Sequence, residues 1–221
     1  MQEIDSSNDQ HRRSAAEIVA TRVTSDLRLN AAAPASEWHN ATPVTFCSDW
    51  QGMHSDMERQ TSVSVLWSLE MLYVRFVCRY RELHMFKDAE PNGRRNRLWE
   101  RDVAEVFLQP DRSQLSCYKE FEIAPNGLWL DLDVAFGVVR DLNSNLNRSV
   151  SVNAQKRRWA AELAIPMPCL TSKFDPSLVW FVNFFRVEGI AEPRAYHAWQ
   201  PTHAPTPNFH VPSAFGSLRF V

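Results

Sequence analysis

Most of the chain is a succession of short segments in which apolar and polar residues alternate. Within residues 71–80, Leu72, Val74 and Phe76 fall on one face and Arg75 falls on the other. A period of two residues is typical of a β-strand. The pair Asn126-Gly127 separates two such segments, and it supplies the positive φ angles of a tight hairpin turn. Since no long stretch has a helical period, the pattern favours an all-β fold.

The spacing of these segments predicts about nine short strands in one domain over residues 36–221. With 221 residues, of which 44% are hydrophobic, the chain has enough apolar material for one sizeable core. The arrangement we expect is an antiparallel β-sandwich of jelly-roll or immunoglobulin-like type. The polar residues 1–35 are expected to form a flexible N-terminal extension, with residues 15–23 as a candidate helix. The clearest strands cover residues 61–67, 71–80, 103–108, 118–123, 128–133, 159–165, 179–187 and 217–221.

The charge balance narrows the classes of partner. There are 24 basic and 26 acidic side chains, for a net charge of −2. This balance argues against binding to nucleic acid or to an anionic membrane surface. No apolar run approaches the roughly 18–20 residues of a membrane helix, so we expect a soluble protein. Residues 1–29 contain no apolar stretch of the kind found in a secretory signal.

Several common chemical motifs are missing from the sequence. The chain contains no GxGxxG or GxxxxGK[ST] phosphate loop, no GxSxG elbow, and no HxxxH or HExxH pair. Its cysteines, Cys47, Cys78, Cys117 and Cys169, are widely spaced and form no CxxC motif. We therefore expect free thiols, with disulfides as the alternative, and we predict no catalytic residue.

Glu105 is the most informative polar residue of the predicted strands. The alternation places Ala104 and Val106 toward the core and Glu105 on the opposite face. A carboxylate between apolar neighbours requires a partner. The first expectation is a cross-strand ion pair with Arg75 or Arg186, and the alternative is a role in binding a ligand.

A second acidic group lies on the hairpin around Asn126, where Glu120 and Glu122 share one face with each other. Two carboxylates can act as acid and nucleophile in glycoside hydrolysis. A glycoside-active hydrolase is therefore one alternative function. Acidic residues on the open face of an antiparallel strand are nevertheless common, and no spacing here singles out a catalytic pair.

The loop at residues 195–212 is rich in proline and has aromatic residues near both ends, Trp199 and Phe209. Such a loop is expected either to cap the edge of the fold or to form a ligand platform. Aromatic faces suit sugars, because one side of a pyranose ring consists of C–H groups, and its hydroxyl rim then needs polar partners.

Five blocks of the sequence, in order, resemble the family 9 carbohydrate-binding modules, which are DOMON-like β-sandwiches. The match runs from about residue 63 to the C-terminus. Its blocks are W-E-x-D-x-x-E-x-F from Trp99, the hairpin of residues 118–131, W-x-x-E-x-x-I-P from Trp159, N-F-F-R from Asn183, and F-H-x-P-x-x-F-G-x-L from Phe209.

The resemblance implies a sugar ring held between two aromatic side chains. Trp99 matches the first wall, Phe209 matches the second in place of a tryptophan, and Glu105 matches a sugar-binding glutamate. Two further binding positions depart from the family: Glu122 stands where the resemblance implies arginine, and Phe185 where it implies glutamine. His210 is the residue that we expect to compensate for them.

The resemblance also implies a wider setting. It suggests a non-catalytic module that binds mono- or oligosaccharides in the catabolism of xylan- or cellulose-type polysaccharides, beside a glycoside hydrolase partner. Family habit indicates an extracellular or periplasmic location, and structural calcium occurs in the family. A haem-binding DOMON-like electron carrier, with a histidine or methionine as axial ligand, is the second alternative.

Overall fold

A computed structural model describes residues 16–90 and 92–221 of the chain. Within them the fold is almost entirely β-structure, with one short helix, α1 (Met167–Leu170), and four 3-10 turns. The strands are β1 (Glu17–Arg22), β2 (Val44–Phe46), β3 (Thr61–Trp67), β4 (Met71–Arg79), β5 (Val103–Gln109), β6 (Cys117–Ile123), β7 (Trp129–Ala135), β8 (Val138–Asp141), β9 (Asn147–Asn153), β10 (Arg158–Pro166), β11 (Trp180–Glu188), β12 (Ala195–Ala198) and β13 (Gly216–Phe220).

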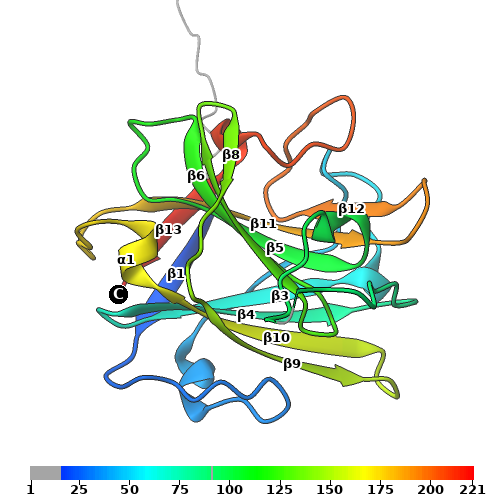
Figure 1. Ribbon diagram of the computed structural model, residues 1–221, viewed down its shortest axis with the longest axis horizontal. Helices are drawn as coiled ribbons and strands as arrows, with labels where there is room; N and C mark the ends of the chain where they lie inside the picture. Colours follow the sequence, from blue (N-terminus) through cyan, green and yellow to red (C-terminus); the bar gives the residue numbers. More distant parts are fainter. Residues whose placement is uncertain (1–15, 91) are drawn as a thin grey trace, which may run out of the picture.

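The strands form one curled mixed sheet (Figure 1). Its order is β8-β7-β6-β5-β11-β13-β1-β3-β4-β10-β9, while β12 pairs with β11 and β2 pairs with β3. All eight of the strands predicted most clearly from the sequence are present, with boundaries within one or two residues. The long hairpin pairs, such as β3 with β4 and β6 with β7, are antiparallel as expected.

The expected all-antiparallel sandwich differs from the structure at β1. This strand runs parallel to both of its neighbours, pairing Ile18 with Leu218 of β13 and Ala20 with Val65 of β3. It therefore joins the two halves of the curled sheet. Its six residues carry too little alternation to predict a strand, and its partners lie far away in the sequence, so neither a helix nor a flexible tail describes residues 17–22. Residues 1–15 lie outside the described part of the chain.

The main core lies inside the curl of the sheet. It joins side chains of β3, β4 and β10 to those of β5, β6 and β11, and Phe76 meets Phe184 edge to face with their ring centroids 6.1 Å apart. Ala104 and Val106 of β5 belong to this core, as the alternation predicts. Burial of these large apolar surfaces is the main source of the fold's stability.

The opposite face of β5 and β11 is also covered. Val103 and Phe107 of β5 pack with Phe185 and Val187 of β11. Phe209 packs over them from the loop of residues 199–211 that follows β12, called the C-terminal loop below. All seven residues of β5 are consequently buried. A polar side chain on this outer face is therefore enclosed by protein, and Glu105 occupies such a position.

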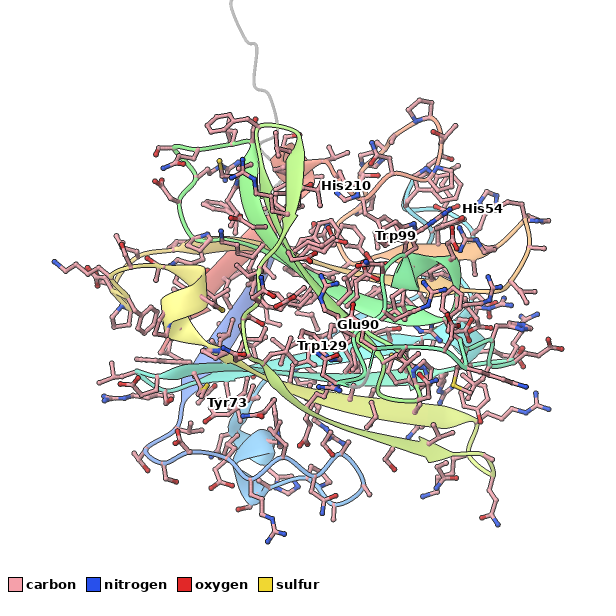
Figure 2. The ribbon with its side chains drawn as sticks, viewed as in Figure 1. His54, Tyr73, Glu90, Trp99, Trp129 and His210 are labelled. Carbon is pink, nitrogen blue, oxygen red and sulfur yellow. The ribbon has the colours of Figure 1, made fainter. Side chains whose placement is uncertain are left out.

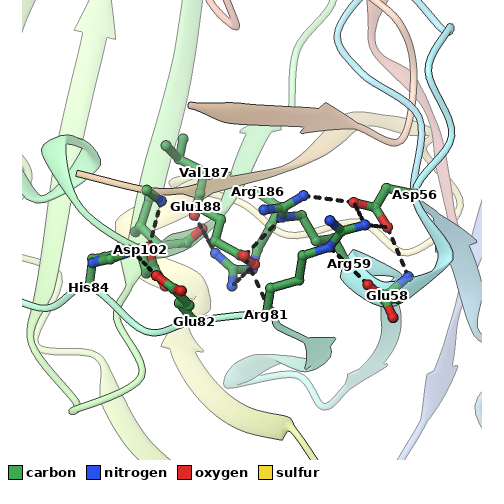
Figure 3. A network of polar contacts seen from close by, with 12 residues as sticks. Asp56, Glu58, Arg59, Arg81, Glu82, His84, Asp102, Arg186, Val187 and Glu188 are labelled. Carbon is green, nitrogen blue, oxygen red and sulfur yellow. Dashed lines mark hydrogen bonds and ion pairs between the residues drawn. The ribbon is translucent and has the colours of Figure 1, made fainter. Parts of the chain in front are cut away.

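The two arginines that were expected to pair with Glu105 have other partners. Arg75 forms an ion pair with Glu162. Arg186, which is 1% exposed, lies 3.5 Å from Glu188, and Glu188 also accepts from Arg59 at 2.8 Å in a network shown in Figure 3. The predicted ion pair of Glu105 with Arg75 or Arg186 is therefore wrong. Both cations are held on other faces of the sheet by nearer carboxylates.

The four cysteines are free thiols, as the sequence predicts. Cys78 is completely enclosed, and its burial raises the pKa of the thiol to about 11. Across residues 16–90 and 92–221, no helix has the length and apolar character needed to cross a membrane.

The junction of β1 with β13 leaves no room for a side chain at Gly216. A Cβ atom there would lie 2.6 Å from the carbonyl oxygen of Ala16 and 2.6 Å from the ring of Trp199. We expect Gly216→Ala to lower the free energy of unfolding by about 1–3 kcal/mol, because either the strand pairing or the tryptophan must shift. Thermal denaturation checks this, with Ser217→Ala as the control; equal stability of the two variants would contradict the tight junction.

Candidate functional site

A cleft of about 390 Å³ opens on the outer face of the β5-β6-β7 half of the sheet. Strands β5, β6, β7, β11 and β12 form its floor, while the 3-10 turn at Leu98–Glu100 and the C-terminal loop form its rim. The lining residues are Trp99, Glu105, Glu120, Leu132, Val139, Val187, Arg194, Tyr196, Pro207, Asn208, Phe209 and His210.

Trp99 is presented to the cleft by a short 3-10 turn. Leu98 is fully buried and anchors this turn, whereas the next residue, Trp99, is 39% exposed. Successive side chains of so tight a helix point in different directions, which separates an anchoring residue from an exposed one. The turn is tied to the opposite rim because Arg194 donates a 2.8 Å hydrogen bond to the carbonyl oxygen of Trp99.

Phe209 forms a second aromatic surface. Its ring stacks on that of Phe185, with centroids 4.2 Å apart and planes 11° from parallel. Phe185 is completely buried, so it supports Phe209 from behind. Tyr196 adds a third ring, edge to face with Phe209 at 6.1 Å. The cleft is thus lined by three aromatic side chains: Trp99, Phe209 of the C-terminal loop and Tyr196 of β12.

Three carboxyl groups lie beneath these rings because of the β5–β6 register. Glu105 is paired with Glu122 across the two strands, and Glu120 follows on the same face of β6. They are 2%, 0% and 3% exposed, respectively. Glu105 and Glu120 reach the lining of the cleft, and Glu122 lies behind them.

Most of the oxygens of this acidic floor lack a hydrogen-bond partner among the described residues. These are Oε1 of Glu105, Oε2 of Glu120 and both oxygens of Glu122, although Glu120 and Glu122 can hydrogen-bond to each other when one of them holds a proton. Burial raises the pKa of all three carboxyl groups, that of Glu120 to about 7. The charge of Glu120 further raises the pKa of Glu105, while the charge of Arg194 lowers it. A polar ligand in the cleft could supply partners to Glu105 and Glu120, which line it, but not to Glu122 behind them.

His210 lines the same cleft, and its side chain is labelled in Figure 2 together with that of Trp99. Its Nδ1 atom is 2.7 Å from the hydroxyl of Tyr118 and 3.9 Å from Oε2 of Glu120. Its ring is tilted over Phe107, with centroids 5.4 Å apart. The imidazole is therefore positioned by its neighbours to offer a ring nitrogen at the cleft.

The structure brings together four of the six predicted binding residues. Trp99, Glu105, Phe209 and His210 all line the cleft. Glu122 and Phe185 do not line it; they lie directly beneath the residues that do.

The sequence prediction missed two side chains of the cleft, Arg194 and Tyr196. Tyr196 belongs to β12, a strand of four residues that is too short to show alternation. Its pairing with Val187 places it on the outer face. The sequence indicates Glu120 as part of the acidic hairpin but does not predict that it lies close to Glu105. That closeness follows from the register of β5 and β6.

The family resemblance implies structural calcium, which proteins bind through carboxylate and carbonyl oxygens. Among the residues that the structure describes, no three His, Cys, Asp or Glu side chains are grouped to hold a metal ion.

Comparison with known proteins by sequence gives distant relatives. No family model matches the chain. It is 22% identical to an extracellular protein of Arthroderma benhamiae, over 73% of this chain and 79% of that protein. It is 28% identical to the human UPF0462 protein C4orf33, over 60% of this chain and 65% of that protein.

Solved structures show what the fold resembles. A protein of Bacteroides uniformis, provisionally described as carbohydrate-binding, superposes with a TM-score of 0.72 at 15% identity, over 94% of this chain and all of that one. A family 9 carbohydrate-binding module of Caldicellulosiruptor kristjanssonii, in complex with cellotriose, gives a TM-score of 0.65 at 14% identity, over 93% of each chain. Its complex with glucose gives 0.66 at 13%, over 93% of this chain and 96% of that one. The chain therefore has a family 9 carbohydrate-binding module-like fold.

Proposed function

We propose that this protein, which has the fold of the family 9 carbohydrate-binding modules, is a non-catalytic carbohydrate-binding protein. The observation that carries the proposal is the cleft itself. It combines exposed aromatic surface from Trp99 with buried carboxyl oxygens that lack partners, and it lies on the face to which the family resemblance assigns the sugar. Bound glucose and cellotriose in two solved structures of this fold support it further.

In the proposed complex a sugar ring lies against Trp99 and Phe209. Its C–H face contacts the aromatic surfaces, and its hydroxyl groups donate to the free oxygens of Glu105 and Glu120. Glu122 and Phe185 act indirectly, one through the charge of the floor and the other by supporting Phe209. We expect modest affinity, because a short sugar offers few atoms and each hydroxyl must lose water.

The natural ligand and setting extend this proposal. Xylan- or cellulose-type chains are the polysaccharides that the family resemblance suggests, in a catabolic role beside a glycoside hydrolase. An extracellular or periplasmic location would fit such a role, and the relationship to an extracellular protein of Arthroderma benhamiae supports it.

Calorimetric titration with glucose, xylose, cellobiose and xylobiose tests the proposal, each sugar beside its reduced alditol. We expect heat from the sugars and none from the alditols if the site holds the reducing-end unit, because reduction opens that ring and removes its flat C–H face. Absence of binding to every sugar by a folded sample would overturn the proposed function.

The acidic floor favours one second candidate, a glycoside-active hydrolase. A carboxyl group with a pKa of about 7, that of Glu120, lies on the same buried face as Glu105. An acid catalyst requires such a raised pKa. Turnover of chromogenic glycosides that disappears in Glu105→Gln would favour the hydrolase, whereas binding without turnover favours the module.

A further inference from the structure

The acidic floor of the cleft contains more buried carboxyl groups than recognition of neutral hydroxyl groups requires. Glu105 and Glu120 are each at least 97% buried, both line the cleft, and each has a buried oxygen without a hydrogen-bond donor among the described residues. Glu122 adds a third carboxyl group directly behind them. Ionising three acids together away from water is costly, which is why burial raises the pKa of each of them, and a ligand of opposite charge would offset that cost.

The protein supplies little of that opposite charge. Among the described residues that line the cleft, Arg194 is the one permanent cation. Its Nε atom already donates to Glu192 at 3.1 Å, and another of its nitrogens donates to the carbonyl oxygen of Trp99. Nδ1 of His210 lies 3.9 Å from Oε2 of Glu120, and burial lowers the pKa of its imidazole, which favours the neutral form. The floor therefore remains short of positive charge.

The walls of the cleft are suited to a cation as well. Aromatic faces attract ammonium groups through the negative potential of their π-systems, most strongly where water is excluded. Trp99, Tyr196 and Phe209 bring three aromatic rings to the same cleft. One of these rings already holds a cation, since the guanidinium of Arg194 lies 4.9 Å from the centre of Tyr196.

The inference drawn from these observations rests on the proposed sugar-binding function, and it specifies a class of ligand for it. We propose that the preferred ligand is an amino sugar, a pyranose whose protonated amino group contacts the carboxylates of Glu105 and Glu120 while its ring lies against Trp99 and Phe209. Neutral hexoses fit the same cleft but bring no positive charge to favour the ionised form of these buried carboxyl groups. Uronic acids bring a like charge to the floor and are rejected.

A matched series of monosaccharides tests this assignment. Calorimetric titration near neutral pH and low salt compares glucosamine, glucose, N-acetylglucosamine and glucuronate. These sugars share one ring and differ in charge or in the group at a single position. We expect glucosamine to bind at least tenfold more tightly than glucose, and glucuronate to bind most weakly. N-acetylglucosamine, which lacks the charge, should group with glucose.

Variants connect the preference to particular residues. Glu120→Gln and Glu105→Gln keep the size of the side chain and remove its charge, so each should reduce the ratio of glucosamine to glucose affinity severalfold. Glu70→Gln is the matched control, because Glu70 is exposed in the turn between β3 and β4, away from the cleft. Its sugar preference should equal that of the unmodified protein.

The outcomes separate the two proposals. If glucose binds as tightly as glucosamine, the amino-sugar assignment is wrong and the sugar-binding function stands. If a folded sample binds none of these sugars or the cellobiose of the earlier titration, both are wrong. A preference for glucosamine that survives in both cleft variants would also overturn the assignment, because the charge would then be read elsewhere.

Discussion

Replacing Glu120 with glutamine is expected to stabilise the ligand-free protein by about 3 kcal/mol at about pH 8 and by much less at about pH 5. For a chain of this size that corresponds to a rise of roughly 6–12 °C in the melting temperature at the higher pH. Thermal denaturation of both proteins across this pH range measures the effect. An increase of this size would be distinct, since most substitutions of surface residues change the free energy of unfolding by only about 0.5 kcal/mol or less.

The direction follows from the proton balance of the carboxyl group. Burial raises the pKa of Glu120 from an ordinary value near 4.5 to about 7 in the folded protein. The folded state therefore holds its proton over a pH range in which the unfolded state has released it. Its contribution to stability is complete below about pH 4.5, declines as pH rises, and is lost above about pH 7. Glutamine carries no charge at any pH and avoids this loss.

The comparison of two proteins isolates this effect from an opposing one. Burial lowers the pKa of His197 to about 4, so acid conditions weaken the fold through that residue. His197 is the same in both proteins, and its contribution cancels in the difference between them. Glu70→Gln serves again as an exposed control. A difference between Glu120→Gln and the unmodified protein that does not vary with pH would show that this carboxyl group titrates normally.

The sequence predicts the strands well where alternation extends over enough residues. In β4 and β10, each nine residues long, every second residue belongs to the main core. The prediction misses five of the thirteen strands that the structure describes, namely β1, β2, β8, β9 and β12. Of these, β1 and β12 have six and four residues. β1 pairs with strands that are distant in sequence, and β12 forms a short pairing with β11. Neither pairing can be predicted from the local sequence.

The candidate site shows the same division. Glu105 was recognisable because a carboxylate in a strand of apolar residues is unusual, and Trp99 and Phe209 because they fall in family-like blocks. Arg194 was not recognisable from the sequence, since nothing there indicates that its side chain donates to the carbonyl oxygen of Trp99. The cluster of Glu105, Glu120 and Glu122 depends on a strand register that the hairpin alone does not determine.

Trp99 is expected to contribute the largest share of sugar affinity. Truncating it in Trp99→Ala should weaken binding by about 2 kcal/mol or more, which is roughly 30-fold in Kd. The ring is 39% exposed and its turn is anchored by Leu98, so the fold should persist with an unchanged melting temperature. Titration with the tightest-binding sugar measures the loss, and Trp99→Phe should recover part of it because a smaller aromatic face remains.

The control for this substitution is Phe136→Ala. Phe136 is 76% exposed and does not line the cleft, so its removal takes away an exposed aromatic ring without touching the proposed site. It should bind sugar as the unmodified protein does. If Trp99→Ala unfolds, the tryptophan is part of the core; if it folds and binds normally, the sugar lies elsewhere. If both folded variants lose affinity equally, exposed aromatic surface in general, and not this cleft, accounts for binding.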